Sequence, residues 1–79
     1  MERADLDRAL LQAHEDKDSE ELVRLFTVAG DMAEETGNID AACFYLTHAF
    51  VFALEAGLPE AKKLNRRLAE RGRAHPFEL

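Results

Sequence analysis

One stretch near the middle of the chain is too apolar for an ordinary surface helix. Between Ala41 and Leu54 only Thr47 and His48 interrupt the apolar run, if Tyr45 is counted as apolar. A helix that is apolar nearly all round is either buried on every side or covered by a partner. Any fold of this chain must therefore surround the segment with its own helices or leave part of it for another molecule.

Glycines mark the ends of three of the four predicted helices. Gly37, Gly57 and Gly72 stand where helical periodicity stops, and no alternating strand pattern lies between them. The expected helices cover about residues 3–15, 19–36, 39–56 and 59–72. Because the loops are short, neighbouring helices should run antiparallel. We therefore predict one all-α domain in residues 1–73, made of four antiparallel helices in two helical hairpins, with a frayed tail at residues 74–79.

Local signals support two of these helix starts. Asp18 with Glu21 three residues later matches a capping box, and Asn38 is a preferred N-cap residue. Gly37 fits the position just after a helix end. Gly30 lies inside the second helix, where glycine costs about 1 kcal/mol relative to alanine. We therefore expect another helix to approach closely at Gly30.

The two halves of the chain overlay when one is shifted by 40 residues. Leu6 then falls on Leu46, and Ala13 falls on Ala53. Such matches at core positions are what a repeated helical hairpin should show. The alternative is that any two amphipathic helices overlay at some shift.

The second and third predicted helices resemble a tetratricopeptide repeat over residues 23–56. The family pattern is W-x2-L-G-x2-Y followed by A-x3-F. Two runs approach it: Phe26-x2-Ala29-Gly30-x2-Ala33 and Ala42-x3-Leu46. Phenylalanine and alanine replace the tryptophan and tyrosine, and no proline closes the repeat. The resemblance implies a protein-interaction scaffold with a peptide groove, built as a right-handed stack of hairpins or, with only two hairpins, as a compact bundle.

One face of the apolar helix is the predicted contact surface. Tyr45, His48 and Phe52 recur at i, i+3 and i+7, with Phe44 and Val51 beside them. Tyrosine and phenylalanine are enriched in the cores of protein interfaces. We expect a second copy, giving a homodimer, or another protein to cover this face. The alternative is that the first and last helices of the same chain cover it.

Few side chains are placed for catalysis or for binding a metal. His48 is the one catalytic candidate, and a hydrogen-bonded structural role explains it better. Cys43 is the only cysteine, and we expect it to be a small buried apolar residue that does not pair with His48. No calcium loop, phosphate loop or nucleophile motif is present in the sequence. We predict no enzyme activity, no metal and no cofactor.

The charge pattern bears on a second class of partner. The net charge is −6, which argues against non-specific binding of nucleic acid. Basic side chains gather on the last helix, where Lys62, Asn65 and Arg66 are candidates for contact with an anion. A solvated basic face is the alternative. A nucleic-acid-linked accessory protein that uses this face is the second functional hypothesis, behind the interaction module.

The sequence also bears on location. We see no signal peptide and no stretch with the roughly 18 to 20 apolar residues that cross a bilayer. A lone cysteine fits a reducing compartment. We therefore expect a cytoplasmic protein that does not bind membranes.

Overall fold

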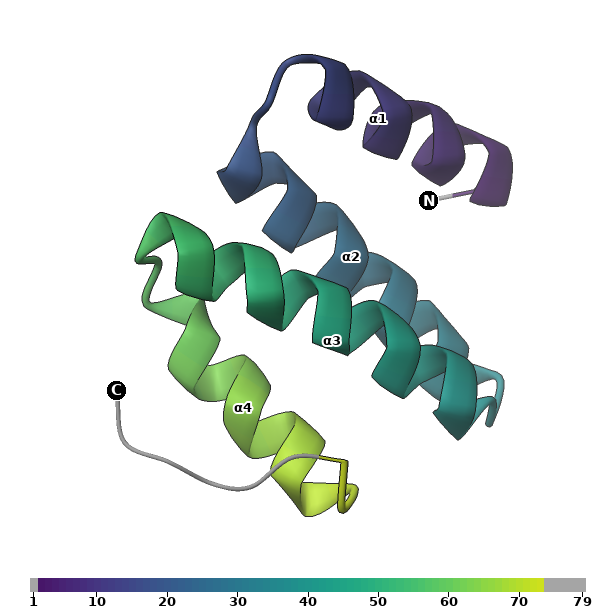
Figure 1. Cartoon of the computed structure of the whole chain (residues 1–79). Coiled ribbons are helices and arrows are strands. Elements are labelled where there is room, and N and C mark those ends of the chain that lie inside the picture. The colour runs from purple at the N-terminus through teal and green to yellow at the C-terminus, as the bar shows by residue number, and fades with distance from the viewer. Residues whose placement is uncertain (1, 74–79) are drawn as a thin grey trace.

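Four α-helices follow one another along residues 2–73, the part of the chain that the computed structural model describes (Figure 1). They are α1 (Arg3–Glu15), α2 (Ser19–Glu35), α3 (Ile39–Ala56) and α4 (Glu60–Glu70). Successive helices run antiparallel, so the predicted all-α fold of four helices is confirmed. The tail at 74–79, which we expected to be frayed, lies outside the described residues.

The three junctions between helices share one hydrogen-bonding pattern. The backbone N–H groups of residues 18, 38 and 58 donate to the carbonyl oxygens of Ala13, Ala33 and Ala53, at 3.0, 2.9 and 2.9 Å. The residue before each donor has a positive φ: 53° at Lys17, 77° at Gly37 and 67° at Gly57. These are Schellman-type helix ends. The donors at residues 18, 38 and 58 are evenly spaced. Two helices with their junctions therefore cover 40 residues, which is the shift that overlays the two halves of the sequence.

The predicted N-caps form at α2 and α3. Asp18 Oδ1 accepts a hydrogen bond from the N–H of Glu21 at 3.2 Å, and Asn38 Oδ1 accepts one from the N–H of Ala41 at 3.1 Å. Only this half of the expected capping box is present. The side chain of Glu21 pairs with Arg24, and the N–H of Asp18 already donates to Ala13.

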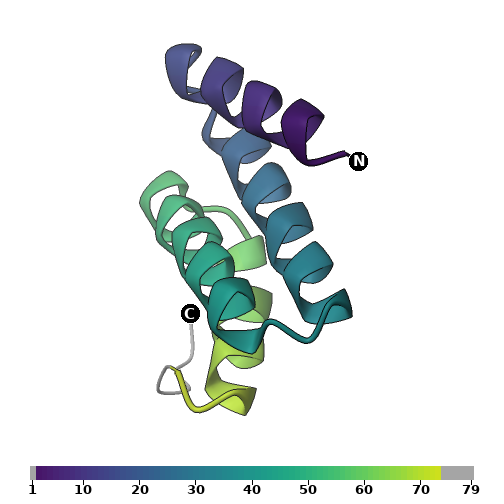
Figure 2. The ribbon, with the colours of Figure 1, turned by 90° about the vertical axis from the view of Figure 1, so that its right-hand side faces the viewer.

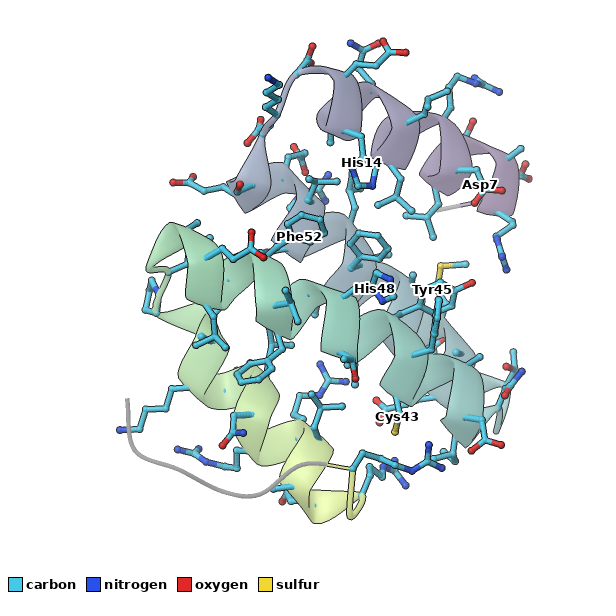
Figure 3. All side chains as sticks on the ribbon, viewed as in Figure 1. Asp7, His14, Cys43, Tyr45, His48 and Phe52 are labelled. Carbon is cyan, nitrogen blue, oxygen red and sulfur yellow. The ribbon has the colours of Figure 1, made fainter. Side chains whose placement is uncertain are left out.

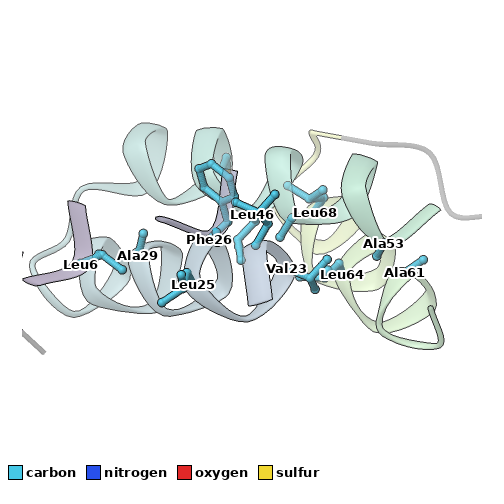
Figure 4. Close-up of a cluster of buried hydrophobic side chains, with 14 residues drawn as sticks. Leu6, Val23, Leu25, Phe26, Ala29, Leu46, Ala53, Ala61, Leu64 and Leu68 are labelled. Atoms are coloured by element: carbon cyan, nitrogen blue, oxygen red, sulfur yellow. The ribbon is translucent and has the colours of Figure 1, made fainter. Parts of the chain in front are cut away.

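The central pair of helices, α2 and α3, carries most of the core. These two helices have the most extensive contact, while α1 packs on α2 and α4 packs on α3. Figure 2 shows α2 and α3 side by side, with α1 crossing above them. The principal dimensions are 32 × 30 × 13 Å, so the arrangement is flat. The buried side chains gather between the helices (Figure 4); they include Leu6, Val23, Leu25, Phe26, Leu46, Leu64 and Leu68.

Gly30 marks the closest approach of α2 to α3. A Cβ at this position would lie 2.8 Å from both Cγ and Cδ2 of Leu46, and 3.4 Å from the carbonyl oxygen of Ala42. Leu46 is completely buried, so its side chain would have to shift within the core to admit a Cβ at this position. The close contact expected from the glycine is therefore confirmed.

By length and composition alone, α3 would pass as a membrane-crossing helix. Its 18 residues have a mean hydropathy of 1.3, and it is the one such helix in the described chain. From the sequence we expected no stretch of this kind. Of these 18 residues 28% are buried within the chain, along the inner side on which α3 packs against α2 and α4.

Candidate functional site

The inner side of α3 belongs to the core of the chain. Its buried residues are Ala42, Cys43, Leu46, Ala49 and Ala53. The expectation that Cys43 is buried is therefore confirmed. Phe50 is only half-buried.

The side of α3 that faces α1 is partly covered. Tyr45, His48 and Phe52 are all half-buried. Nη2 of Arg3 donates a 3.0 Å hydrogen bond to the hydroxyl of Tyr45, and the ring of His14 lies 5.9 Å from that of Phe52. In Figure 3 His14 points from α1 toward the labelled side chains of α3. The first helix thus covers part of the face that we predicted to meet a partner.

A row of rings connects α1, α2 and α3. Phe26 of α2 lies between the two histidine rings, with centroids 6.1 Å from His14 and 5.2 Å from His48. It also stacks on Phe52 at 5.9 Å. The Nδ1 of His48 donates to the carbonyl oxygen of Phe44 at 3.0 Å. Both histidines therefore take part in packing.

A groove of about 400 Å³ lies between α1 and α3, with α2 at its base. Its walls mix apolar and polar side chains, which include Arg3, Asp7, Leu10, Met32, Thr36 and Tyr45. Such mixed walls point to no single class of ligand.

The outward side of α3 is different, because it has large apolar side chains in contact with water. Phe44 is 59% exposed, Val51 44% and Leu54 42%. Thr47, which is also exposed, lies between them. We call Phe44, Thr47, Val51 and Leu54 the outer stripe of α3. Sequence reasoning named Phe44 and Val51 and missed Leu54, although the i, i+3, i+7, i+10 spacing of the stripe could have revealed it.

Much of the positive charge near α4 is used within the chain. Three arginines form ion pairs with acidic residues of α2 and α3: Arg67 with Asp31 and Glu34, Arg71 with Glu34, and Arg73 with Asp40. Burial of Arg67 lowers its pKa, but the hydrogen bonds and charges of Asp31 and Glu34 outweigh this effect and raise it. These arginines are held in place by the fold.

The three residues of the predicted anion contact differ in their exposure to water. Lys62 and Arg66 are exposed, and no acidic side chain of residues 2–73 pairs with them. Asn65 is only 3% exposed and lies on the core side of α4. The structure therefore brings Lys62 and Arg66 to one exposed face and leaves Asn65 away from it.

Within residues 2–73, no group of three or more histidine, cysteine or acidic side chains is placed to hold a metal ion. In the same part of the chain, every buried side-chain nitrogen and oxygen has a hydrogen-bond partner. The outer stripe of α3 is a group of large apolar side chains that the packing of this region leaves exposed.

Comparison of the chain with protein-family models, with curated proteins and with solved structures gives no significant match. The function has to be inferred from the geometry of the chain's own residues.

Proposed function

We propose that this protein is a small interaction module without catalytic activity, which associates through α3 with itself or with another protein. The observation that carries the proposal is the outer stripe. Phe44, Val51 and Leu54 keep 42–59% of their surface in water although they lie on the central helix. Contiguous exposed apolar surface on a small domain is typical of a protein-interaction site.

A non-catalytic role is supported by the surroundings of the two histidines on the described chain. His48 donates to a backbone carbonyl and packs on Phe26. The ring of His14 packs on Phe26 and Phe52. A general base acts on a nucleophile or a bound substrate beside its free nitrogen, and the neighbours of these two rings are a backbone carbonyl and aromatic side chains.

We further propose that the hairpin of α2 and α3 is tetratricopeptide-like. Support comes from the small residue Gly30, which allows Leu46 and the Ala42 backbone to approach α2 closely. This alternation of small and bulky residues is the one that the family pattern uses.

The test is site-specific photo-cross-linking in the cells that make the protein. Benzoylphenylalanine in place of Phe44 should give one discrete covalent adduct, with a second copy or with another protein. Leu11 on α1 is the matched control, because it is apolar and 61% exposed but lies away from α3. No adduct at Phe44, or the same adducts from both positions, would contradict the proposal.

The second candidate is a nucleic-acid-linked accessory role. It is supported by the exposed Lys62 and Arg66, and opposed by the arginine ion pairs and by the net charge of −6. Failure of the protein to retard DNA or RNA on a gel at low salt would remove it.

A further inference from the structure

We propose that the partner is a second copy of this chain, and that the two α3 helices pair antiparallel through their outer stripes. In this pair, Phe44 of each copy enters an apolar hollow beside Leu54 of the other. The inference rests on the proposed function and specifies its partner and geometry.

The spacing of the outer stripe is that of a helix–helix seam. Phe44, Thr47, Val51 and Leu54 follow one another at steps of three, four and three residues. This is the heptad spacing by which two helices interlock their side chains. Such a stripe matches one straight helix of a partner better than it matches a rounded pocket.

The two ends of the stripe differ in shape and complement each other. Phe44 projects at one end. At the other end lies a hollow of about 510 Å³ between α3 and the start of α4, lined by Ala53, Leu54, Gly57, Leu58, Pro59 and Lys62. Gly57, whose φ is 67°, contributes to the wall of this hollow without a side chain.

An antiparallel twofold pair brings these two ends together. Phe44 and Leu54 are separated by about 15 Å along the helix at 1.5 Å per residue. When α3 meets its copy in the opposite direction, Phe44 lies opposite Leu54 of the second copy and Thr47 lies opposite Val51. In a twofold interface each contact occurs twice, so two aromatic side chains fill two hollows.

The ring of Phe44 is already held in position for this contact. It lies 4.5 Å from the ring of His48 and 5.6 Å from that of Tyr45. A side chain that is restrained before binding loses less conformational entropy when it is buried.

The charges at the ends of the stripe favour the same direction. Asp40 and Arg73 form an ion pair near Phe44, while Glu55 and Lys62 lie near Leu54. Antiparallel pairing brings Arg73 toward Glu55 of the second copy. Parallel pairing would place Asp40 on Asp40 and Glu55 on Glu55, and like charges repel at an interface.

The test measures solution mass and the register of the pair. Light scattering should give twice the chain mass of 8.9 kDa. Phe44→Asp should halve the measured mass, whereas Leu11→Asp, the control on α1, should leave it unchanged. Circular dichroism of both variants shows that the helices remain folded.

The register follows from disulfide cross-linking in a Cys43→Ala background. Thr47→Cys and Val51→Cys are purified separately and oxidised alone and as a mixture. Disulfides need Cα atoms within about 7 Å, so the covalent dimer should form readily in the mixture and slowly in either variant alone.

The outcomes separate this inference from the proposed function. If the protein is a monomer at every soluble concentration, the proposal that its partner is a second copy is wrong. A discrete adduct between Phe44 and a different protein would still support the proposed interaction module. A dimer in which each cysteine variant links to itself faster than in the mixture overturns the antiparallel geometry alone. A dimer with mixture-dependent cross-links supports the whole arrangement.

Discussion

Nη2 of Arg67 on α4 donates a 2.7 Å hydrogen bond to Oε1 of Glu34 on α2. Arg71 donates to the other carboxylate oxygen of Glu34 at 3.0 Å. One partly buried carboxylate thus links α4 to α2, two helices that are not successive in the chain. Desolvation raises the pKa of Glu34, but the hydrogen bonds and charges of Arg71 and Arg67 outweigh it and hold the pKa below its ordinary value of 4.5.

This link predicts a loss of stability in acid. Because the folded pKa of Glu34 is lowered, its stabilisation is complete above pH 4.5 and is lost as the pH falls through the folded value. Glu34→Gln should therefore lower the free energy of unfolding at pH 7 by about 1 kcal/mol. The difference from wild type should shrink steadily below pH 4.5 in urea titrations.

Glu35→Gln is the matched control for this experiment, because Glu35 is the exposed neighbour on the same helix and forms no ion pair with residues 2–73. It should change the unfolding free energy by much less at either pH. Equal losses from both substitutions would mean that net charge, and not the link to α4, sets the acid response.

The contact between Gly30 and Leu46 predicts an unusual response to alanine. In most helices glycine to alanine stabilises by about 1 kcal/mol. Here the new methyl group would overlap the buried Leu46 side chain, and overpacking costs about 1–3 kcal/mol. Gly30→Ala should therefore lower the melting temperature. The double variant with Leu46→Ala should lose less than the sum of the two single losses, and strict additivity would rule out the clash.

Helix positions followed from local signals in the sequence. Glycine stops, the caps at Asp18 and Asn38 and the apolar spacing depend on residues that are near neighbours in the chain, so they could be read without knowledge of the tertiary fold. The close packing at Gly30 could also be predicted, because an interior glycine has an evident cost.

The side of α3 that is covered could not be read in this way. All of its sides are apolar, so spacing does not tell which side meets α1 and which meets water. The answer depends on long-range contacts, such as the hydrogen bond from Arg3 to Tyr45 and the packing of His14 on Phe52. The same limit explains why Asn65 was grouped with exposed residues although it lies toward the core.

At the first junction between helices, replacing Lys17 by glycine should stabilise the fold. Lys17 adopts a φ of 53°, where Gly37 and Gly57 occupy the corresponding positions of the next two junctions. A left-handed conformation costs a non-glycine residue roughly 1–2 kcal/mol. Lys17→Gly should therefore raise the unfolding free energy by up to about 1 kcal/mol, while Gly37→Ala should lower it by a similar amount. Chemical denaturation measures both, and a destabilised Lys17→Gly variant would contradict the argument.

The ring contacts of His14 predict how α1 is held on the rest of the fold. His14 packs on Phe26 and on Phe52, and edge-to-face ring pairs contribute about 0.5–1.5 kcal/mol each. His14→Ala should speed amide hydrogen exchange in α1 by about fivefold or more, which corresponds to about 1 kcal/mol, and should change α3 and α4 less. Gln12→Ala, at an exposed position of the same helix, is the control. Alanine has a higher helix propensity than histidine or glutamine. Faster exchange in the His14 variant alone would therefore come from lost contacts with α2 and α3. Equal protection in both variants would show that these rings do not hold α1.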